Sequence, residues 1–273
     1  MVEIFGPVLD VRPLFGRERR ELLRLLGSLS AAEWSAPTVC PGWTVHDLAG
    51  HILNDYMRRL SGGRDGFAGA KFANDETLPA YLTRVNDEFV RAMRQVSPDL
   101  IVQLLTVLGP ELDRLWESFD LTAPAMLDVS WAGPGTSPAW LDIAREYTEF
   151  WVHQQQIRDA VGRPGADEPE LVRPVLDAFM RALPHTLRDV VRPEGTVVRV
   201  VVPDGGTWHA RSDGQRWRMA AGGEPAATVT MRPGDFWRLA TRGISVDEAR
   251  RRADLDGDRE LAGAVTTLLA VVA

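Results

Sequence analysis

The chain has 273 residues, 45% of them hydrophobic and 25% charged, and it carries a formal net charge of −7 at pH 7. A chain with excess negative charge has little attraction for phosphate backbones or anionic lipid, so nucleic acid and membrane partners are disfavoured. The length corresponds to about two domains on the usual prior of roughly 150 residues each.

The single cysteine, Cys40, excludes an intrachain disulfide and any zinc site built from several cysteines. No stretch approaches the ~20 apolar residues of a membrane span, and the first residues lack a basic segment followed by a long apolar run. We therefore expect a cytoplasmic protein whose metal ligands, if it has any, are His, Asp or Glu side chains.

The first hundred residues predict helices. Leucines at helical spacing favour a helix over 12–29. Ser30 and Glu33 form a capping-box pattern for a short helical turn. Thr44 is a suitable cap for a helix that runs to about Leu60.

Four further stretches complete the predicted helical part. Helices are expected over 79–95 and 98–119, with a break or kink in the second at Gly109-Pro110. A Gly- and Pro-rich loop over 130–140 leads into a helix over 138–161, and a bent helix follows over 168–190.

From residue 195 the hydrophobic pattern changes to period two, which is typical of strands. Four short strands separated by Gly-rich turns predict an antiparallel meander. Short helices over 233–241 and 246–252, an extended piece over 254–257 and a last helix from Asp258 follow. The sequence thus predicts an α+β protein, with a helical bundle over 1–192 and a small α/β domain with an antiparallel sheet over 193–273.

Glu149 and His153 are four residues apart on the helix expected over 138–161, so both side chains point the same way and could hold a metal ion. His51, late in the helix that Thr44 caps, is the best candidate for a third ligand. Two imidazoles and one carboxylate leave a coordination position open, which is typical of catalytic metal sites. The alternatives are a surface ion pair for Glu149 and His153, and a core histidine for His51.

Three neighbours give this arrangement further chemistry. Arg145, one turn before Glu149, could be an outer partner of the carboxylate or a clamp for an acidic substrate group. Asp55, one turn after His51, could fix the tautomer of that ring. Cys40 is either a nucleophile or a packed loop thiol.

The motifs LSAAEW, PTVCPGWTVHDLAGH, SWAGPGTSPAW and AREYTEFWVH together resemble the mycothiol-dependent maleylpyruvate isomerase family, part of the DinB-like superfamily. The resemblance implies a four-helix bundle that brings two histidines and a glutamate to one divalent metal, usually zinc. At the matching positions these ligands are His51, Glu149 and His153. It also implies a sterol-carrier-like C-terminal domain and mycothiol as cofactor. One departure is Gln156, where family members often carry Asp.

A thiol bound to a divalent metal loses its proton and becomes a nucleophile. We therefore expect a mycothiol-dependent isomerase or thiol S-transferase acting on a small electrophile, with catalytic Arg145 holding an acidic group and Trp131 and Trp140 walling the cofactor pocket. The alternatives are a non-haem iron oxygenase on the same ligand set and a binding protein without chemistry. The sequence indicates neither the substrate nor the oligomeric state.

Overall fold

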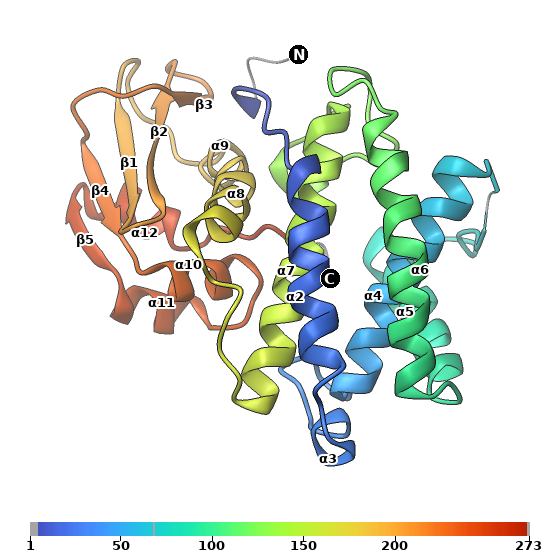
Figure 1. Ribbon diagram of the computed structural model, residues 1–273. Helices are drawn as coiled ribbons and strands as arrows, with labels where there is room; N and C mark the ends of the chain where they lie inside the picture. Colours follow the sequence, from blue (N-terminus) through green and yellow to red (C-terminus); the bar gives the residue numbers. More distant parts are fainter. Residues whose placement is uncertain (1–4, 68, 272–273) are drawn as a thin grey trace. The chain divides into compact units, whose positions relative to one another are not determined.

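The computed structural model describes residues 5–67 and 69–271, which pack into two compact units (Figure 1). The helical unit contains residues 11–120 and 146–167, and the sheet unit contains residues 5–10, 121–145 and 168–271. Helix α7 (Ala139–Val161) begins in the sheet unit and ends in the helical unit. The domain limits 1–192 and 193–273 remain a prediction, because a compact unit need not coincide with a segment that folds alone.

The helices of the helical unit lie close to their predicted positions, because the predicted caps form. Ser30 and Glu33 make a capping box, and Thr44 makes another with Asp47. Gly162, directly after α7, has a φ of 65°, the left-handed conformation that ends helices. Before α7 this unit contains α2 (Phe15–Leu26), α3 (Ala31–Trp34), α4 (Val45–Arg59), α5 (Leu78–Met93) and α6 (Pro98–Glu117).

Aromatic side chains fill the core between the long helices. The ring of Phe15, on α2, lies 5.5 Å from that of Tyr147 and 5.9 Å from that of Phe150, both on α7. Tyr56, on α4, lies 4.8 Å from Phe150. Helix α6 packs against α2 and α4, and α5 packs against α4. The expected bundle is therefore built from α2, α4, α6 and α7, with α5 on its outside.

Of the break or kink predicted at Gly109-Pro110, the break does not occur, because helix α6 continues through both residues. Gly109 lies under the side chain of Arg19, and a Cβ there would come within 2.3 Å of the arginine Cδ. Arg19 passes over this glycine to donate to Asp113 Oδ1 at 2.9 Å. The glycine thus marks the place where another helix crosses and not a helix end.

The sheet unit contains a five-stranded sheet in the order β3-β2-β1-β4-β5. The α+β class is confirmed, and β1, β2 and β3 form the predicted antiparallel meander. The fourth strand departs from it, because β4 crosses over and pairs in parallel with β1, placing Val229 beside Val200. Both valines are buried, so this pairing gives the sheet an apolar centre. The strands are β1 (Val197–Val202), β2 (Gly206–Ser212), β3 (Trp217–Ala220), β4 (Ala227–Thr230) and β5 (Asp254–Gly257).

Helices cover one face of this sheet (Figure 1). The bent helix predicted over 168–190 is in fact two, because the first ends at Met180 and a second, with Pro184 in its first turn, begins at Leu183. The helices after α7 are α8 (Pro169–Met180), α9 (Leu183–Thr186), α10 (Pro233–Ala240), α11 (Val246–Arg252) and α12 (Arg259–Val265). Across residues 5–67 and 69–271, no helix is both long and apolar enough to span a membrane.

Candidate functional site

The site begins at the tight turn that precedes α4. Trp43 N donates to Cys40 O at 3.1 Å, and Gly42 has a φ of 78°. This is a type II turn, in which proline suits the second position and glycine the third. Thr44 then caps α4, and the buried carboxylate of Asp47 accepts two hydrogen bonds from Arg94 at 2.8 and 3.1 Å. The turn and the first helical turn are thus firmly held.

His51 lies one helical turn beyond Asp47 and is buried, with 8% of its side chain exposed. Its ring packs against Trp43, with ring centroids 5.1 Å apart. Nε2 lies 3.6 Å from Oδ2 of Asp55, and Nδ1 is buried without a hydrogen bond partner among the described residues. A buried polar atom without a hydrogen bond partner lowers the stability of the fold, so we expect Nδ1 of His51 to bind a ligand.

Helix α7 places Glu149 and His153 beside His51. The rings of His51 and His153 have centroids 4.8 Å apart and meet nearly at right angles. Nε2 of His153 lies 3.4 Å from Oε2 of Glu149 and, among the described residues, has no hydrogen bond partner. The three residues predicted as ligands are therefore neighbours in one place, although they come from two helices about a hundred positions apart.

Two residues complete what we call the histidine cluster, which consists of His51, Asp55, Glu149, His153 and Gln156. Oε1 of Gln156 accepts hydrogen bonds from Nδ1–H of His153 at 2.8 Å and from the Cys40 thiol at 3.4 Å. An amide oxygen cannot donate, so His153 carries a proton on Nδ1, and its Nε2 faces the Glu149 carboxylate. The residue that departs from the family pattern thus fixes the tautomer of the predicted ligand.

Burial and charge set the protonation of the cluster. Burial, with the neighbouring His153, lowers the pKa of His51 to about 3, so this ring is neutral at pH 7. Burial also lowers the pKa of His153, but the Glu149 carboxylate, Gln156 and Asp55 together outweigh burial and raise this pKa overall. Burial, followed by the carboxylates of Glu146 and Glu149, raises the pKa of Asp55 to about 7. Burial raises the pKa of Cys40, which disfavours a free thiolate there.

No group of three or more His, Cys, Asp or Glu side chains within residues 5–67 and 69–271 has the arrangement of a metal site as it stands. The donor atoms nevertheless suit one. Two ligands of a tetrahedral zinc ion, each about 2.1 Å from the metal, lie roughly 3.4 Å from each other, which matches the 3.4 Å between Glu149 Oε2 and His153 Nε2. The buried nitrogen atoms of both histidines lack partners among the described residues. The residues therefore fit a divalent metal.

The other predicted site residues belong to the sheet unit. Arg145 is 17% exposed and donates to Asp142 Oδ1. Trp131 is 7% exposed and packs against Phe179, with ring centroids 6.5 Å apart. Trp140 is fully buried, and the guanidinium of Arg181 lies 5.3 Å from the centre of its ring. The structure defines these surroundings, and the catalytic and cofactor-binding roles of the three residues remain predictions.

The sequence did not predict a second buried polar group, which we call the glutamate cluster and which consists of Glu18, Gln154 and Arg158. Gln154 Nε2 donates to Glu18 Oε1 at 2.7 Å, and its Oε1 accepts from Arg158 at 3.0 and 3.1 Å. Burial raises the pKa of Glu18 to about 7. The signal that could have revealed it is the run of three glutamines after His153, since a helix with bulky apolar neighbours rarely carries them without partners.

A scan of family models matches residues 15–158 to the mycothiol maleylpyruvate isomerase N-terminal domain. This match covers more than half of the chain. The chain belongs to the mycothiol maleylpyruvate isomerase family. The family, a DinB-like one, is the one that the motifs around His51 and His153 indicated, and both histidines lie inside the matched range.

Similar proteins agree with this family. An uncharacterised protein of Mycobacterium tuberculosis, present in strains H37Rv and CDC 1551, is 30% identical over 209 residues, covering 74% of this chain and 76% of its own length. The crystal structure of a mycothiol-dependent maleylpyruvate isomerase is 17% identical with a TM-score of 0.53, covering 87% of this chain and 90% of that one. The structure of a variant with one histidine changed to alanine is 16% identical with a TM-score of 0.55, covering 92% of this chain and 93% of that one. These identities are low, so the two solved structures show a shared fold.

Proposed function

We propose that this protein is a metal-dependent enzyme that activates mycothiol, either to isomerise a small electrophilic substrate or to transfer sulfur to it. The observation that carries the proposal is the pair of buried imidazoles with unpartnered ring nitrogens among the described residues, beside the carboxylate of Glu149. A buried Nδ1 of His51 without a partner is costly unless a ligand uses it. Membership of the family supports mycothiol as the thiol.

We propose His51, Glu149 and His153 as the ligands of one divalent metal, with zinc as the favoured ion. Three protein ligands of this kind leave one position for a small molecule. A divalent ion held by these residues would lower the pKa of a bound thiol and so supply a nucleophilic sulfur at pH 7.

The chain's own residues prepare this chemistry. Burial keeps the pKa of His51 low, so that its ring is neutral and has a lone pair to give. Gln156 holds the proton of His153 on Nδ1 and leaves Nε2 for the metal. Asp55, 3.6 Å from Nε2 of His51, orients that ring.

Beyond the ligands, we propose that Arg145 binds an acidic group of the substrate and that Trp131 and Trp140 shape the pocket for the cofactor. A guanidinium matches a carboxylate through two parallel hydrogen bonds, which positions a substrate acid. Aromatic walls keep water from the reactive sulfur.

The test is a turnover assay with purified protein, mycothiol and maleylpyruvate, read as conversion to the trans isomer. A second arm offers an alkylating electrophile with mycothiol and detects the S-conjugate by mass spectrometry. We expect thiol-dependent turnover in at least one arm, and a loss of more than roughly 100-fold in His153→Ala, since metal ligands contribute more than the outer partners whose loss costs 10–100-fold.

Two results would contradict the proposal. Turnover that needs iron and oxygen but no thiol would make the protein an oxygenase on the same ligand set. Tight binding of mycothiol or maleylpyruvate without conversion in either arm would make it a binding protein.

A further inference from the structure

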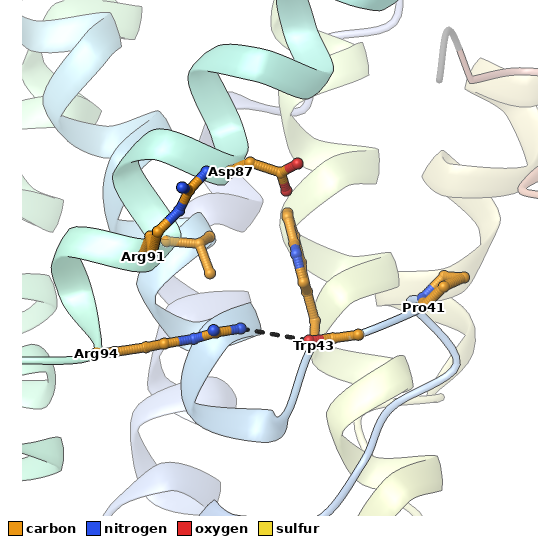
Figure 2. Close-up of a pocket in the computed structure, with 7 residues that line it drawn as sticks. Pro41, Trp43, Asp87, Arg91 and Arg94 are labelled. Atoms are coloured by element: carbon orange, nitrogen blue, oxygen red, sulfur yellow. Dashed lines mark hydrogen bonds between the residues drawn. The ribbon is translucent and has the colours of Figure 1, made fainter.

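A second feature of the helical unit is a cavity of about 260 Å³ that is lined by Trp43, the residue whose ring packs on His51. It lies between the turn before α4 and the last two helical turns of α5. Its lining residues are Pro41, Gly42, Trp43, Asp87, Val90, Arg91 and Arg94 (Figure 2). Its volume lies just below the roughly 300–1,000 Å³ of ordinary ligand pockets, which limits it to a small ligand such as a single ring.

The charges around this cavity are balanced. Arg94 is already committed, because it donates to both oxygens of Asp47 and to Gly42 O at 3.3 Å. One acidic and one basic side chain remain, Asp87 and Arg91. An anion would meet the Asp87 carboxylate and a cation would meet Arg91, so the cavity favours a ligand without net charge.

Asp87 and Arg91 are also unusually placed towards each other. They are four residues apart on α5 with opposite charges, the spacing at which helical ion pairs form. Within the described part of the chain, however, neither side chain makes an ion pair or a hydrogen bond. Both line the cavity (Figure 2). A group that donates to the carboxylate and accepts from the guanidinium would join them, and neighbouring hydroxyl groups on one ring do both.

Trp43 supplies the third element of recognition. Its half-buried ring forms one wall and rises towards Asp87 (Figure 2). The face of an indole carries partial negative charge, which attracts the weakly positive C–H bonds of a saturated ring. Polar groups at one edge and an aromatic face at the other are therefore complementary to a polyhydroxylated ring.

We infer that this cavity binds an uncharged, polyhydroxylated ring, held by Asp87 and Arg91 and packed on Trp43. The inference deepens the proposed function and rests on it, because a ring bound here would belong to the part of the thiol cofactor that does not react. The turn that walls the cavity also touches the histidine cluster: Trp43 packs on His51, and Cys40 donates to Gln156. The cavity would then bind one ring of the cofactor near the proposed site of its reacting sulfur.

The test measures binding of myo-inositol, with methyl glucoside as a second neutral ring and malonate as an anionic probe, to the full-length protein by ligand-observed NMR titration. We expect both neutral rings to bind and malonate to bind more weakly. Asp87→Ala and Arg91→Ala should each raise the Kd for myo-inositol at least tenfold. Glu88→Ala, on the same helix but outside the cavity, is the matched control and should leave it unchanged.

Several outcomes would overturn the inference. Malonate binding that exceeds myo-inositol binding and disappears in Arg91→Ala would show an anion site. Equal affinity for myo-inositol in all variants would place the ring elsewhere, and no binding of either neutral ring would remove the site. Circular dichroism checks that each variant is folded.

The measurement also separates this inference from the proposed function. If the enzyme turns over, Asp87→Ala and Arg91→Ala should raise the KM for mycothiol with unchanged metal content. If no turnover is found while the variants still weaken myo-inositol binding, the proposed function fails and the cavity assignment stands. Turnover with an unchanged KM for mycothiol in both variants would overturn the cavity assignment alone.

Discussion

Two buried polar clusters include neighbouring residues of helix α7, His153 and Gln154, and they differ in how many of their polar atoms have hydrogen bond partners. In the glutamate cluster, Gln154 joins Glu18 to Arg158 through hydrogen bonds. Among the described residues, Oε2 of Glu18 is the only side-chain atom of this cluster that is buried without a hydrogen bond partner. In the histidine cluster, ring nitrogens of both His51 and His153 are left over. In a cluster that only stabilises the fold, the polar atoms form hydrogen bonds with one another, whereas a cluster that binds a ligand leaves some polar atoms without a protein partner.

The largest expected effect follows from removing one of these ring nitrogens. His153→Ala should lower the affinity for zinc by more than roughly 100-fold, because the ligand itself is lost and not only an outer partner. Metal content after dialysis, measured by mass spectrometry of the metal, should fall from about one ion per chain to nearly none. His209→Ala, on strand β2 of the sheet unit, is the control and should retain its metal. Full retention in His153→Ala would remove this residue from the site.

The second effect tests whether the glutamate cluster is purely structural. The pKa of Glu18 is about 7 in the fold against an ordinary 4.5. Below pH 4.5 the carboxyl is neutral in both states and costs nothing. As the pH rises from 4.5 through 7 the unfolded chain ionises first, so the folded state loses roughly 3 kcal/mol.

Glu18→Gln removes that loss. The variant should match the parent protein near pH 4.5 and exceed its free energy of unfolding by roughly 3 kcal/mol at pH 8.5, measured by urea denaturation at both values. Zinc affinity should not change. A parallel drop in zinc affinity would show that the two clusters act together, and the contrast between them would fail.

The third effect concerns the outer partner of His153. Gln156→Leu removes the acceptor that holds the proton on Nδ1, so zinc affinity should fall about tenfold, within the 10–100-fold range of such partners. Gln156→Asp restores an acceptor and should recover the affinity. Competition with a chromogenic chelator measures both. If Gln156→Leu and Gln156→Asp have the same zinc affinity, Gln156 contributes packing and not a hydrogen bond.

The smallest effect is expected at Cys40. Its thiol is a weak donor to Gln156, and burial raises its pKa, so it is not prepared to attack a substrate. Cys40→Ala should keep zinc affinity within about threefold, since weak hydrogen bonds of this kind contribute little. Turnover with mycothiol should persist. Loss of all turnover with metal retained would restore the nucleophile that the sequence also allowed.

The sequence predicted the proximity of His51, Glu149 and His153 from two local rules and one resemblance. Four-residue spacing places Glu149 and His153 on one helical face, and the capping residue Thr44 fixes where α4 begins and hence where His51 points. The resemblance to the family then joined the two helices. Neither rule depends on contacts that are distant in sequence.

The misses all involve distant partners. Gly109-Pro110 reads as a helix break until Arg19, ninety positions earlier, is seen to pass over the glycine. The parallel pairing of β4 with β1 depends on which buried strands meet in space, and period-two patterns carry no such information. Glu18 and Gln154 are 136 positions apart, so no local sequence pattern predicts that they form a hydrogen bond.

The close approach of Arg19 to Gly109 limits which substitutions can raise the stability of this protein. Exchanging a mid-helix glycine for alanine normally strengthens a helix by about 1 kcal/mol. Here the added methyl group would collide with the Arg19 side chain and force it away from Asp113. An engineer raising thermal tolerance by helix propensity alone would loosen the crossing of α2 and α6, so the glycine should be kept.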